Sequence, residues 1–185
     1  AQPLDIIIND GDIYFEGYGI DSSFNMIPCY WKNGSCILLP LPAGAISGET
    51  DDIIINDGVV YIAGDYYNGS SYLPCYWKNG SCIPLPLPTG AIGGSVEEII
   101  ENDGDIYIKG SYLNSSFITF PCYWKNGKCI SLPVPNSDQG GYAGEIIFSD
   151  DDIYIDGWTY NGYGFPIAGY WKNNEWVSSD VIDET

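Results

Sequence analysis

One motif occurs four times along this chain, and its fixed spacing is the feature that most constrains the fold. Three copies read Cys-Tyr-Trp-Lys-Asn-Gly-x-Cys, and the fourth keeps the central Tyr-Trp-Lys-Asn. The tryptophans of the motif follow one another at steps of 46, 47 and 47 residues; they are Trp31, Trp77, Trp124 and Trp171. A repeat of this length is typical of supersecondary units that share one core. The chain is therefore expected to consist of four such units.

Each unit contains short β-branched and aromatic runs that are separated by turn residues. In the first unit these runs cover residues 5–9, 13–17, 26–31 and 36–41. Asn-Asp-Gly-Asp at residues 9–12 and Lys-Asn-Gly at residues 32–34 are turn sequences, with glycine supplying a positive φ. No stretch shows a helical period with capping residues. The pattern predicts four antiparallel strands in each unit.

These features predict an all-β protein that forms one four-bladed β-propeller domain over residues 1–185, with four antiparallel strands per blade. A β-sandwich or an open row of hairpins is the alternative, and strict repetition favours the propeller. The blades are expected at about residues 5–50, 51–97, 98–145 and 146–185. Their innermost strands are expected to contain residues 6–8, 53–55, 99–100 and 146–148. Closure of the ring is expected to come from packing between the first and last blades.

The charge of the chain excludes several classes of partner. It carries 25 acidic residues against six basic ones, all lysines, for a net charge of −19. Nucleic acid and anionic membranes need a cationic surface, so neither is expected to bind. No apolar run is long enough to cross a bilayer, so membrane insertion is not expected either.

The sequence gives no sign of catalysis. The chain has no histidine, which excludes a nucleophile paired with histidine. Its carboxylates recur at the hairpin turns and form no unique pair of the kind that a glycosidase uses. We therefore expect a protein that is not an enzyme.

The cysteines occur as one pair in each of the first three motifs: Cys29 and Cys36, Cys75 and Cys82, and Cys122 and Cys129. The fourth motif has lost both together, to Gly169 and Trp176, which favours a disulfide within each hairpin. A two-residue turn places Trp31 opposite Cys36, whereas a four-residue loop places Cys29 opposite Cys36. Diagonal neighbours are about 7 Å apart, so the four-residue loop is expected if the disulfide forms.

Other uses of the cysteines are less well supported. Each pair belongs to a different blade and lacks Cys-x-x-Cys spacing, which speaks against a zinc site or a redox centre. Regularly paired cysteines and the opening Ala-Gln-Pro favour a secreted protein from which a signal peptide has been removed.

The Cys-Tyr-Trp-Lys-Asn-Gly core, the Leu-Pro that follows it and the later Asp-Ile-Tyr-Ile-x-Gly resemble the tandem repeats of proteins secreted by treponemes and related host-associated bacteria. The resemblance covers nearly the whole chain. It implies a β-propeller fold and export, and it assigns no activity. The second cysteine of each hairpin, and Gly169 and Trp176 in the fourth copy, depart from the pattern of that family.

Aspartates at the repeated turns are candidate Ca²⁺ ligands: Asp10, Asp12, Asp103, Asp105 and Asp151. Ca²⁺ takes about six oxygens or more, and no single loop supplies them. The favoured interpretation is that aspartate and glycine form the hairpin turns. No cofactor is therefore expected.

Aromatic residues in loops rich in Asn, Gly and Ser are candidates for glycan binding. An aromatic ring can stack on the C–H face of a neutral sugar while amides and carboxylates bind its hydroxyls. The candidates are Tyr66, Tyr67, Trp158, Tyr160 and Tyr163. The four repeated tryptophans are expected to pack between blades instead.

The fourth outer strand lacks the prolines that follow the other three motifs, and it lacks the cysteine pair. Proline blocks strand edges, so this strand is predicted to pair outside its own blade. The predicted assembly strand is Glu175, Trp176, Val177, Ser178, Ser179, Asp180, Val181 and Ile182. The first hypothesis is a structural or adhesive protein outside the cell, whose copies join head to tail into filaments through this strand. The alternative is a monomeric lectin-like propeller that binds host or microbial glycans.

Overall fold

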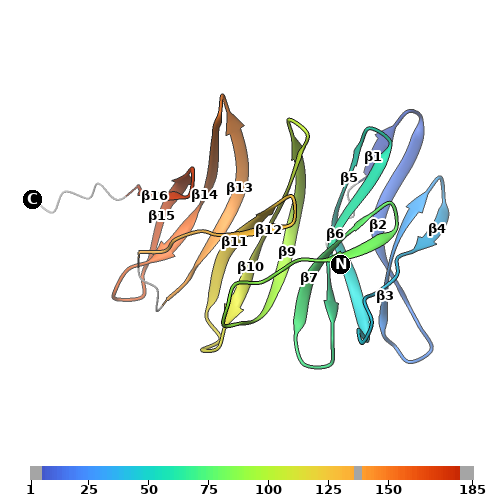
Figure 1. Cartoon of the computed structure of the whole chain (residues 1–185), viewed down its shortest axis with the longest axis horizontal. Coiled ribbons are helices and arrows are strands. Elements are labelled where there is room, and N and C mark those ends of the chain that lie inside the picture. The colour runs from blue at the N-terminus through green and yellow to red at the C-terminus, as the bar shows by residue number, and fades with distance from the viewer. Residues whose placement is uncertain (1–5, 136–138, 180–185) are drawn as a thin grey trace, which may run out of the picture.

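The computed structural model describes residues 6–135 and 139–179 and confirms the all-β fold. The described residues form sixteen strands in four sheets, and each sheet is an antiparallel meander of four consecutive strands. We number these sheets as blades 1 to 4 in chain order. The predicted four-bladed propeller architecture, with four strands per blade, is thus present (Figure 1).

The strands have the following bounds. Blade 1 contains β1 (Ile6–Asn9), β2 (Asp12–Ile20), β3 (Met26–Lys32) and β4 (Ser35–Leu38). Blade 2 contains β5 (Ser47–Asn56), β6 (Val59–Tyr67), β7 (Tyr72–Lys78) and β8 (Ser81–Pro84). Blade 3 contains β9 (Ala91–Asn102), β10 (Asp105–Asn114), β11 (Thr119–Lys125) and β12 (Lys128–Ser131). Blade 4 contains β13 (Gly141–Ser149), β14 (Asp152–Tyr160), β15 (Pro166–Lys172) and β16 (Glu175–Ser178).

Two-residue turns close the first and third hairpins of each blade. In blade 1, Asn9 pairs with Asp12 around the turn residues Asp10 and Gly11, whose φ angles are 49° and 85°. Both turn residues have positive φ, as a type I′ turn requires, and Asp and Gly tolerate that conformation. The sequence Asn-Asp-Gly-Asp therefore specifies both the turn and the register of the strands beside it.

The first strand of each blade contains the predicted β-branched run, and in blades 2 to 4 it is longer than that run. Strands β5, β9 and β13 begin before it and include a β-bulge. The bulges leave Asp51 in β5, Glu97 in β9, and Gly144 and Glu145 in β13 outside the regular ladder. A bulge re-aims side chains, and here each of these three bulges holds an acidic one.

Hydrophobic clusters lie between consecutive blades. The cluster between blades 2 and 3 contains Tyr61 and Ala63 from blade 2 and Ile99, Ile108 and Trp124 from blade 3. Equivalent residues form the clusters between blades 1 and 2 and between blades 3 and 4. The blades are therefore held together by side chains that recur at the same positions of each repeat.

The tryptophans of blades 2 to 4 are central to these contacts. Trp77, Trp124 and Trp171 are fully buried. Each indole N–H donates a 2.7 Å hydrogen bond to a proline carbonyl in the linker that follows the preceding blade; the acceptors are Pro40, Pro86 and Pro133. The prediction that the repeated tryptophans pack between blades is confirmed for these three.

The same hydrogen bonds correct the interpretation of the prolines. Strands β4 and β12 end at Leu38 and Ser131, so among the prolines that follow the first three motifs only Pro84 lies within an outer strand and the others lie in linkers. The prolines fix linkers whose carbonyls face the next blade, and they do not block strand edges as the sequence analysis expected.

The blades follow one another in a row, and blades 1 and 4 lie at its opposite ends (Figure 1). The extensive contacts among the described strands join blade 1 to 2, blade 2 to 3 and blade 3 to 4. The expected closure by packing between the first and last blades is therefore wrong. One face of each end blade is left without a neighbouring blade.

Candidate functional site

A cleft of about 480 Å³ opens between blades 2 and 3, at the end of the molecule where longer loops join the second and third strands of each blade (Figure 1). Its walls come from the β6–β7 loop, the start of β9, the end of β10 and the β10–β11 loop. This volume falls within the range of small-molecule binding pockets.

Two exposed aromatic side chains flank the cleft. Tyr72 is 47% exposed and Phe117 is 75% exposed, and both line it. Phe117 has a φ of 60°, an uncommon conformation for a bulky residue. The side-chain oxygen of Asn114 accepts hydrogen bonds from the backbone N–H groups of Ser116 and Ile118, which fixes this loop. The loop therefore holds an apolar ring in solvent at some conformational cost.

Small polar residues line much of the remaining wall. Ser95 of β9 and Ser111 of β10 are paired across neighbouring strands of blade 3, and their hydroxyl oxygens are 3.3 Å apart. The side-chain oxygen of Asn68 accepts the backbone N–H groups of Ser70 and Ser71 and so orders the β6–β7 loop. At Gly94, a Cβ atom would lie 2.7 Å from the carbonyl oxygen of Ser111, so a larger residue does not fit there without movement.

The cleft also contains two acidic residues, Glu49 and Asp65. Asp65 is only 5% exposed and accepts a 3.2 Å hydrogen bond from the backbone N–H of Val96. Burial, and then the negative charge of Asp51, raise the pKa of Asp65 from 3.8 to about 9. Asp65 is therefore protonated at neutral pH and has a hydrogen to donate.

The acidic character continues into the neighbouring strand β9. Glu97 and Glu98 lie 3.5 Å and 3.3 Å from the ammonium group of Lys109, whose side chain is 10% exposed. Lys109 therefore balances part of the negative charge beside the cleft, because a buried cation is retained only where it is paired.

Sequence reasoning missed this site, although aligned repeats contain a signal for it. The carboxylates of Glu49 and Asp65 occupy positions where blade 3 has Ser95 and Ser111. The position of Lys109 is Glu16 in blade 1 and Ala63 in blade 2. Glu49, Asp65 and Lys109 are thus charged residues in or beside this cleft that break the repeat, and they lie outside the hairpin turns at which the carboxylates were expected to recur.

The predicted glycan-binding aromatics do not form one site. Tyr66 packs into the cluster between blades 1 and 2. Tyr67 lies 5.2 Å from Tyr72, between ring centroids, and is therefore next to the cleft. The other three belong to blade 4, where Trp158 stacks on Tyr142 at 4.4 Å. Two of these lie outside that stack, the partly exposed Tyr160 and Tyr163, which is 89% exposed.

The opposite end of the molecule carries the acidic turns. Asp12 forms a 2.7 Å ion pair with Lys32 and accepts a 2.7 Å hydrogen bond from the side-chain amide of Asn33. The ammonium group of Lys32 also lies over the ring of Tyr14. These contacts, first the hydrogen bond from Lys32, lower the pKa of Asp12. The same arrangement recurs around Asp105 and Asp152. The Lys-Asn of the repeated motif thus ties the third hairpin to the first.

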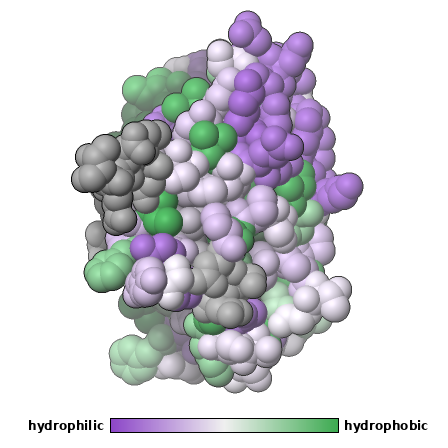
Figure 2. All heavy atoms as spheres, turned by 90° about the vertical axis from the view of Figure 1, so that its left-hand side faces the viewer, coloured by the Kyte–Doolittle hydropathy of each residue, from purple (hydrophilic) through white to green (hydrophobic). Residues whose placement is uncertain are grey.

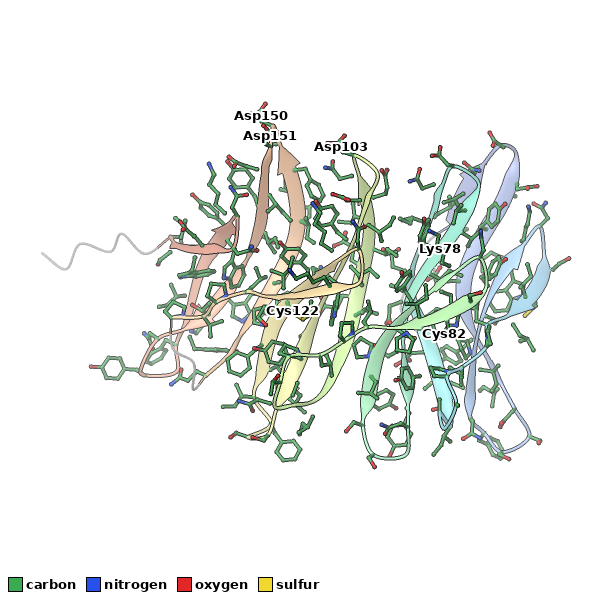
Figure 3. The ribbon with its side chains drawn as sticks, in the orientation of Figure 1. Lys78, Cys82, Asp103, Cys122, Asp150 and Asp151 are labelled. Carbon is green, nitrogen blue, oxygen red and sulfur yellow. The ribbon has the colours of Figure 1, made fainter. Side chains whose placement is uncertain are left out.

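The candidate Ca²⁺ ligands belong to this end. Asp12 and Asp105 are in the ion pairs just described, and Asp10 is an exposed turn residue. Asp103, Asp105 and Asp151 border a second cleft, of about 260 Å³, between blades 3 and 4. Figure 3 shows Asp103 and Asp151 at the tips of hairpins at this end of the molecule. Within residues 6–135 and 139–179, no three Asp, Glu, Cys or His side chains are arranged to hold a metal ion.

The cysteines of each hairpin interact in the reduced form. Trp31 pairs with Cys36 and Cys29 with Leu38, so the hairpin has a two-residue turn and the four-residue loop expected with a disulfide is wrong. The thiols still meet across the diagonal, and burial together with the hydrogen bond to Cys36 raises the pKa of Cys29 to about 12. Cys75 with Cys82, and Cys122 with Cys129, interact in the same way. Disulfides within each hairpin remain a prediction.

The predicted assembly strand is described as far as Ser179. Residues Glu175–Ser178 form β16, which pairs with β15 at the edge of its sheet. Strand β16 has four residues, as β4, β8 and β12 do. Asp180, Val181 and Ile182 lie outside the described residues.

No protein-family model and no curated protein matches this sequence. Solved structures with a similar fold include a fucose lectin from Kordia zhangzhouensis in complex with methyl-fucoside, at 13% identity and a TM-score of 0.50 over 68% of this chain and 94% of the lectin. A thermostable family-43 glycoside hydrolase is 13% identical, with a TM-score of 0.53 over 96% of this chain and 74% of the hydrolase. An endo-arabinase from Bacteroides thetaiotaomicron is 14% identical, with a TM-score of 0.50 over 95% of this chain and 78% of the arabinase.

Among the described residues there is no helix of the length and hydrophobicity needed to cross a membrane. At identities of 13–14% these structural similarities show the fold alone. This chain therefore shares the β-propeller fold of proteins that bind or cleave carbohydrates.

Proposed function

We propose that the protein is an exported, non-catalytic carbohydrate-binding protein and that the cleft between blades 2 and 3 binds a neutral glycan. The observation that carries the proposal is the combination of surfaces in this cleft. A phenylalanine ring on a fixed loop and the ring of Tyr72 flank it, and serine hydroxyls line the wall between them. Rings that stack on sugar C–H faces and hydroxyls that bind sugar hydroxyls are what a neutral saccharide needs.

Charge restricts the class of glycan. The chain has a net charge of −19, and Glu49 lies in the cleft itself. Anionic sugars are therefore repelled. Protonated Asp65 acts in the opposite way, because its O–H can donate a hydrogen bond to a neutral acceptor such as a ring or hydroxyl oxygen.

The acidic pair in the cleft supports binding better than hydrolysis. A general acid works best with a pKa near the working pH. The pKa of Asp65, about 9, means that the carboxyl holds its proton too tightly for efficient transfer at neutral pH. We therefore assign Asp65 a role as hydrogen-bond donor and propose no catalytic residue.

The test is binding to an array of neutral glycans, with fucosides as the first probe because one protein of similar fold was solved with methyl-fucoside. Phe117→Asn removes the ring and suits a positive φ, so binding should weaken by at least about tenfold, as the loss of roughly 1.4 kcal/mol requires. Phe24→Asn is the matched control, because Phe24 has a φ of 66° and is 88% exposed in the equivalent loop of blade 1.

Three results would contradict the proposal. One is the absence of binding to any neutral glycan, another is an equal loss of binding in both variants, and the third is cleavage of the bound glycan.

A second candidate function is a structural or adhesive one, in which copies join head to tail into filaments through residues 175–182. The observation that favours it is the position of β16 at the edge of the described sheet of blade 4. Deletion of residues 180–185 tests this route, since it shortens the donor strand without touching the pairing of β16 with β15.

A further inference from the structure

The two ends of the blade row expose the two halves of an interface that the chain makes three times internally. We call the face of a blade that packs on the preceding blade its trailing face, and the face that packs on the following blade its leading face. The trailing faces of blades 2, 3 and 4 cover the leading faces of blades 1, 2 and 3. No blade formed by residues 6–135 and 139–179 covers the trailing face of blade 1 or the leading face of blade 4 (Figure 1).

The trailing face of blade 1 is strongly apolar. Ile6 is 68% exposed, whereas its equivalents Ile53, Ile99 and Ile146 are 1%, 2% and 5% exposed in the internal interfaces. Ile8 and Leu38 on the same face are 72% and 65% exposed. Contiguous exposed apolar side chains of this kind mark interaction surfaces in soluble proteins.

An aromatic pair completes this face. The rings of Phe15 and Trp31 are stacked 4.8 Å apart, and both are only partly buried. In the other blades the residue equivalent to Trp31 is 0% exposed and donates its indole N–H to the preceding linker. Blade 1 therefore presents the same tryptophan to solvent, ready to receive a linker and a leading face.

The leading face of blade 4 is the matching half. Tyr170 is 39% exposed, whereas its equivalent Tyr123 is 3% exposed against blade 4. Ile147 and Val177 beside it are 51% and 37% exposed. Figure 2 looks onto this end of the molecule, where strongly hydrophilic residues gather toward one edge and paler or green residues spread across much of the rest. Equivalent positions on blade 2, such as Ile54 and Tyr76, pack against blade 3.

We propose that a second copy of this chain covers each end face, with blade 1 of one copy packed on blade 4 of the next as blades pack within one chain. The two faces lie at opposite ends of the row and do not meet in one molecule (Figure 1). They carry the residue types that already fit each other in three internal interfaces, so the contact continues an interface that the fold itself defines. It uses side chains of sheet faces and is distinct from strand addition at β16.

The contact joins two different surfaces, so it is heterologous. Such an arrangement makes a ring where the rotation between copies closes and a filament where it does not. The net charge of −19 opposes association, so assembly should increase with ionic strength as repulsion is screened.

The first experiment measures molar mass by light scattering over a range of protein and salt concentrations. We expect species of at least twice the chain mass of 20.3 kDa, growing with concentration or settling at one closed size. Ile8→Asp and Tyr170→Asp each place a charge on one end face and should reduce the mass to that of one chain. Ile46→Asp is the control, because Ile46 is 48% exposed in the linker between blades 1 and 2 and lies on neither face.

Mixing the two face variants tests the head-to-tail arrangement. Ile8→Asp keeps its blade 4 face and Tyr170→Asp keeps its blade 1 face, so an equimolar mixture should form a dimer and nothing larger. A wild-type protein that stays a single chain at all concentrations overturns the proposal. Thermal unfolding of each variant first establishes that both are folded. A mixture of the two folded variants that stays as single chains overturns the head-to-tail arrangement.

Two further arms separate this inference from the other proposals. Deletion of residues 180–185 should leave the mass unchanged, and a drop to single chains would assign assembly to the C-terminal strand instead. Binding to neutral glycans involves Phe117 and should persist in Ile8→Asp. Glycan binding and assembly can therefore each fail without the other.

Discussion

The buried carboxyl of Asp65 should make this protein more stable in mild acid than at neutral pH. The pKa of Asp65 is raised from 3.8 to about 9 by burial and by the charge of Asp51. Between these values the folded chain keeps the proton that the unfolded chain releases. The stabilisation is therefore complete below about pH 3.8 and is lost as the pH rises toward 9.

The magnitude follows from proton linkage. One proton retained only by the folded state changes the free energy of unfolding by about 1.4 kcal/mol for each pH unit. From pH 5 to pH 8 the contribution of Asp65 should thus fall by about 4 kcal/mol at most, since relaxation around the carboxylate reduces it. The carboxylates of Asp12, Asp105 and Asp152 have lowered pKa values, so their contributions change below pH 3.8 and not in this window.

Asp65→Asn removes the titration of this carboxyl and keeps an oxygen that can accept the N–H of Val96. The neighbouring Asp51, whose pKa burial raises to about 7, still titrates in both proteins, so the difference between the two curves reports Asp65. Urea unfolding followed by tryptophan fluorescence at pH 5, 6, 7 and 8 should show a small stability difference between this variant and wild type at pH 5. At pH 8 the variant should be the more stable protein. Asp57→Asn is the control, because it removes one exposed charge at a turn residue whose φ of 49° suits asparagine. Parallel pH curves for wild type and Asp65→Asn would refute the assignment of a protonated Asp65.

Two other predictions follow from the repeat. Trp124→Phe should lower the free energy of unfolding by roughly 2–4 kcal/mol, because it leaves the Pro86 carbonyl without its indole partner and opens a cavity. Trp31→Phe, at the partly exposed equivalent position, should lower it by less than about 1 kcal/mol. Denaturant unfolding of both variants measures the difference. Each cysteine pair should form a disulfide within its hairpin under oxidising conditions, contributing near the low end of about 2–4 kcal/mol because the closed loop is short. Peptide mapping without reductant checks the pairing, and links between different hairpins would contradict it.

The fold could be predicted because its determinants are local and repeated. Turn residues such as Asp10 and Gly11 fix the hairpins, and the β-branched runs fix the first strands. The arrangement of blades could not be predicted in the same way. Whether blade 4 meets blade 1 depends on the small rotation between consecutive blades, which a repeating pattern of residues does not state.

The role of the prolines was missed for a related reason. Pro40 is close in sequence to the outer strand β4, which ends at Leu38, and proline is a common device at strand edges. Its function lies in its carbonyl, which accepts the indole N–H of Trp77 in the next blade. A contact between residues 37 positions apart is visible only when the packing of blades is known.

The candidate site lies where the repeats differ, which is why a search for shared motifs did not find it. Residues that recur in every blade, such as Tyr14 and Trp77, are committed to packing. One position next to this packing carries Glu16, Ala63, Lys109 and Asp156 in the four blades. This position faces the next blade, yet its charge changes from repeat to repeat. Its side chain is therefore not required for the packing that all blades share. Glu49 and Asp65, the two acidic residues that line the cleft between blades 2 and 3, also occupy positions that break the repeat. In a repeat protein, the search for function therefore begins at the positions that break the repeat and only then moves to the motif that defines it.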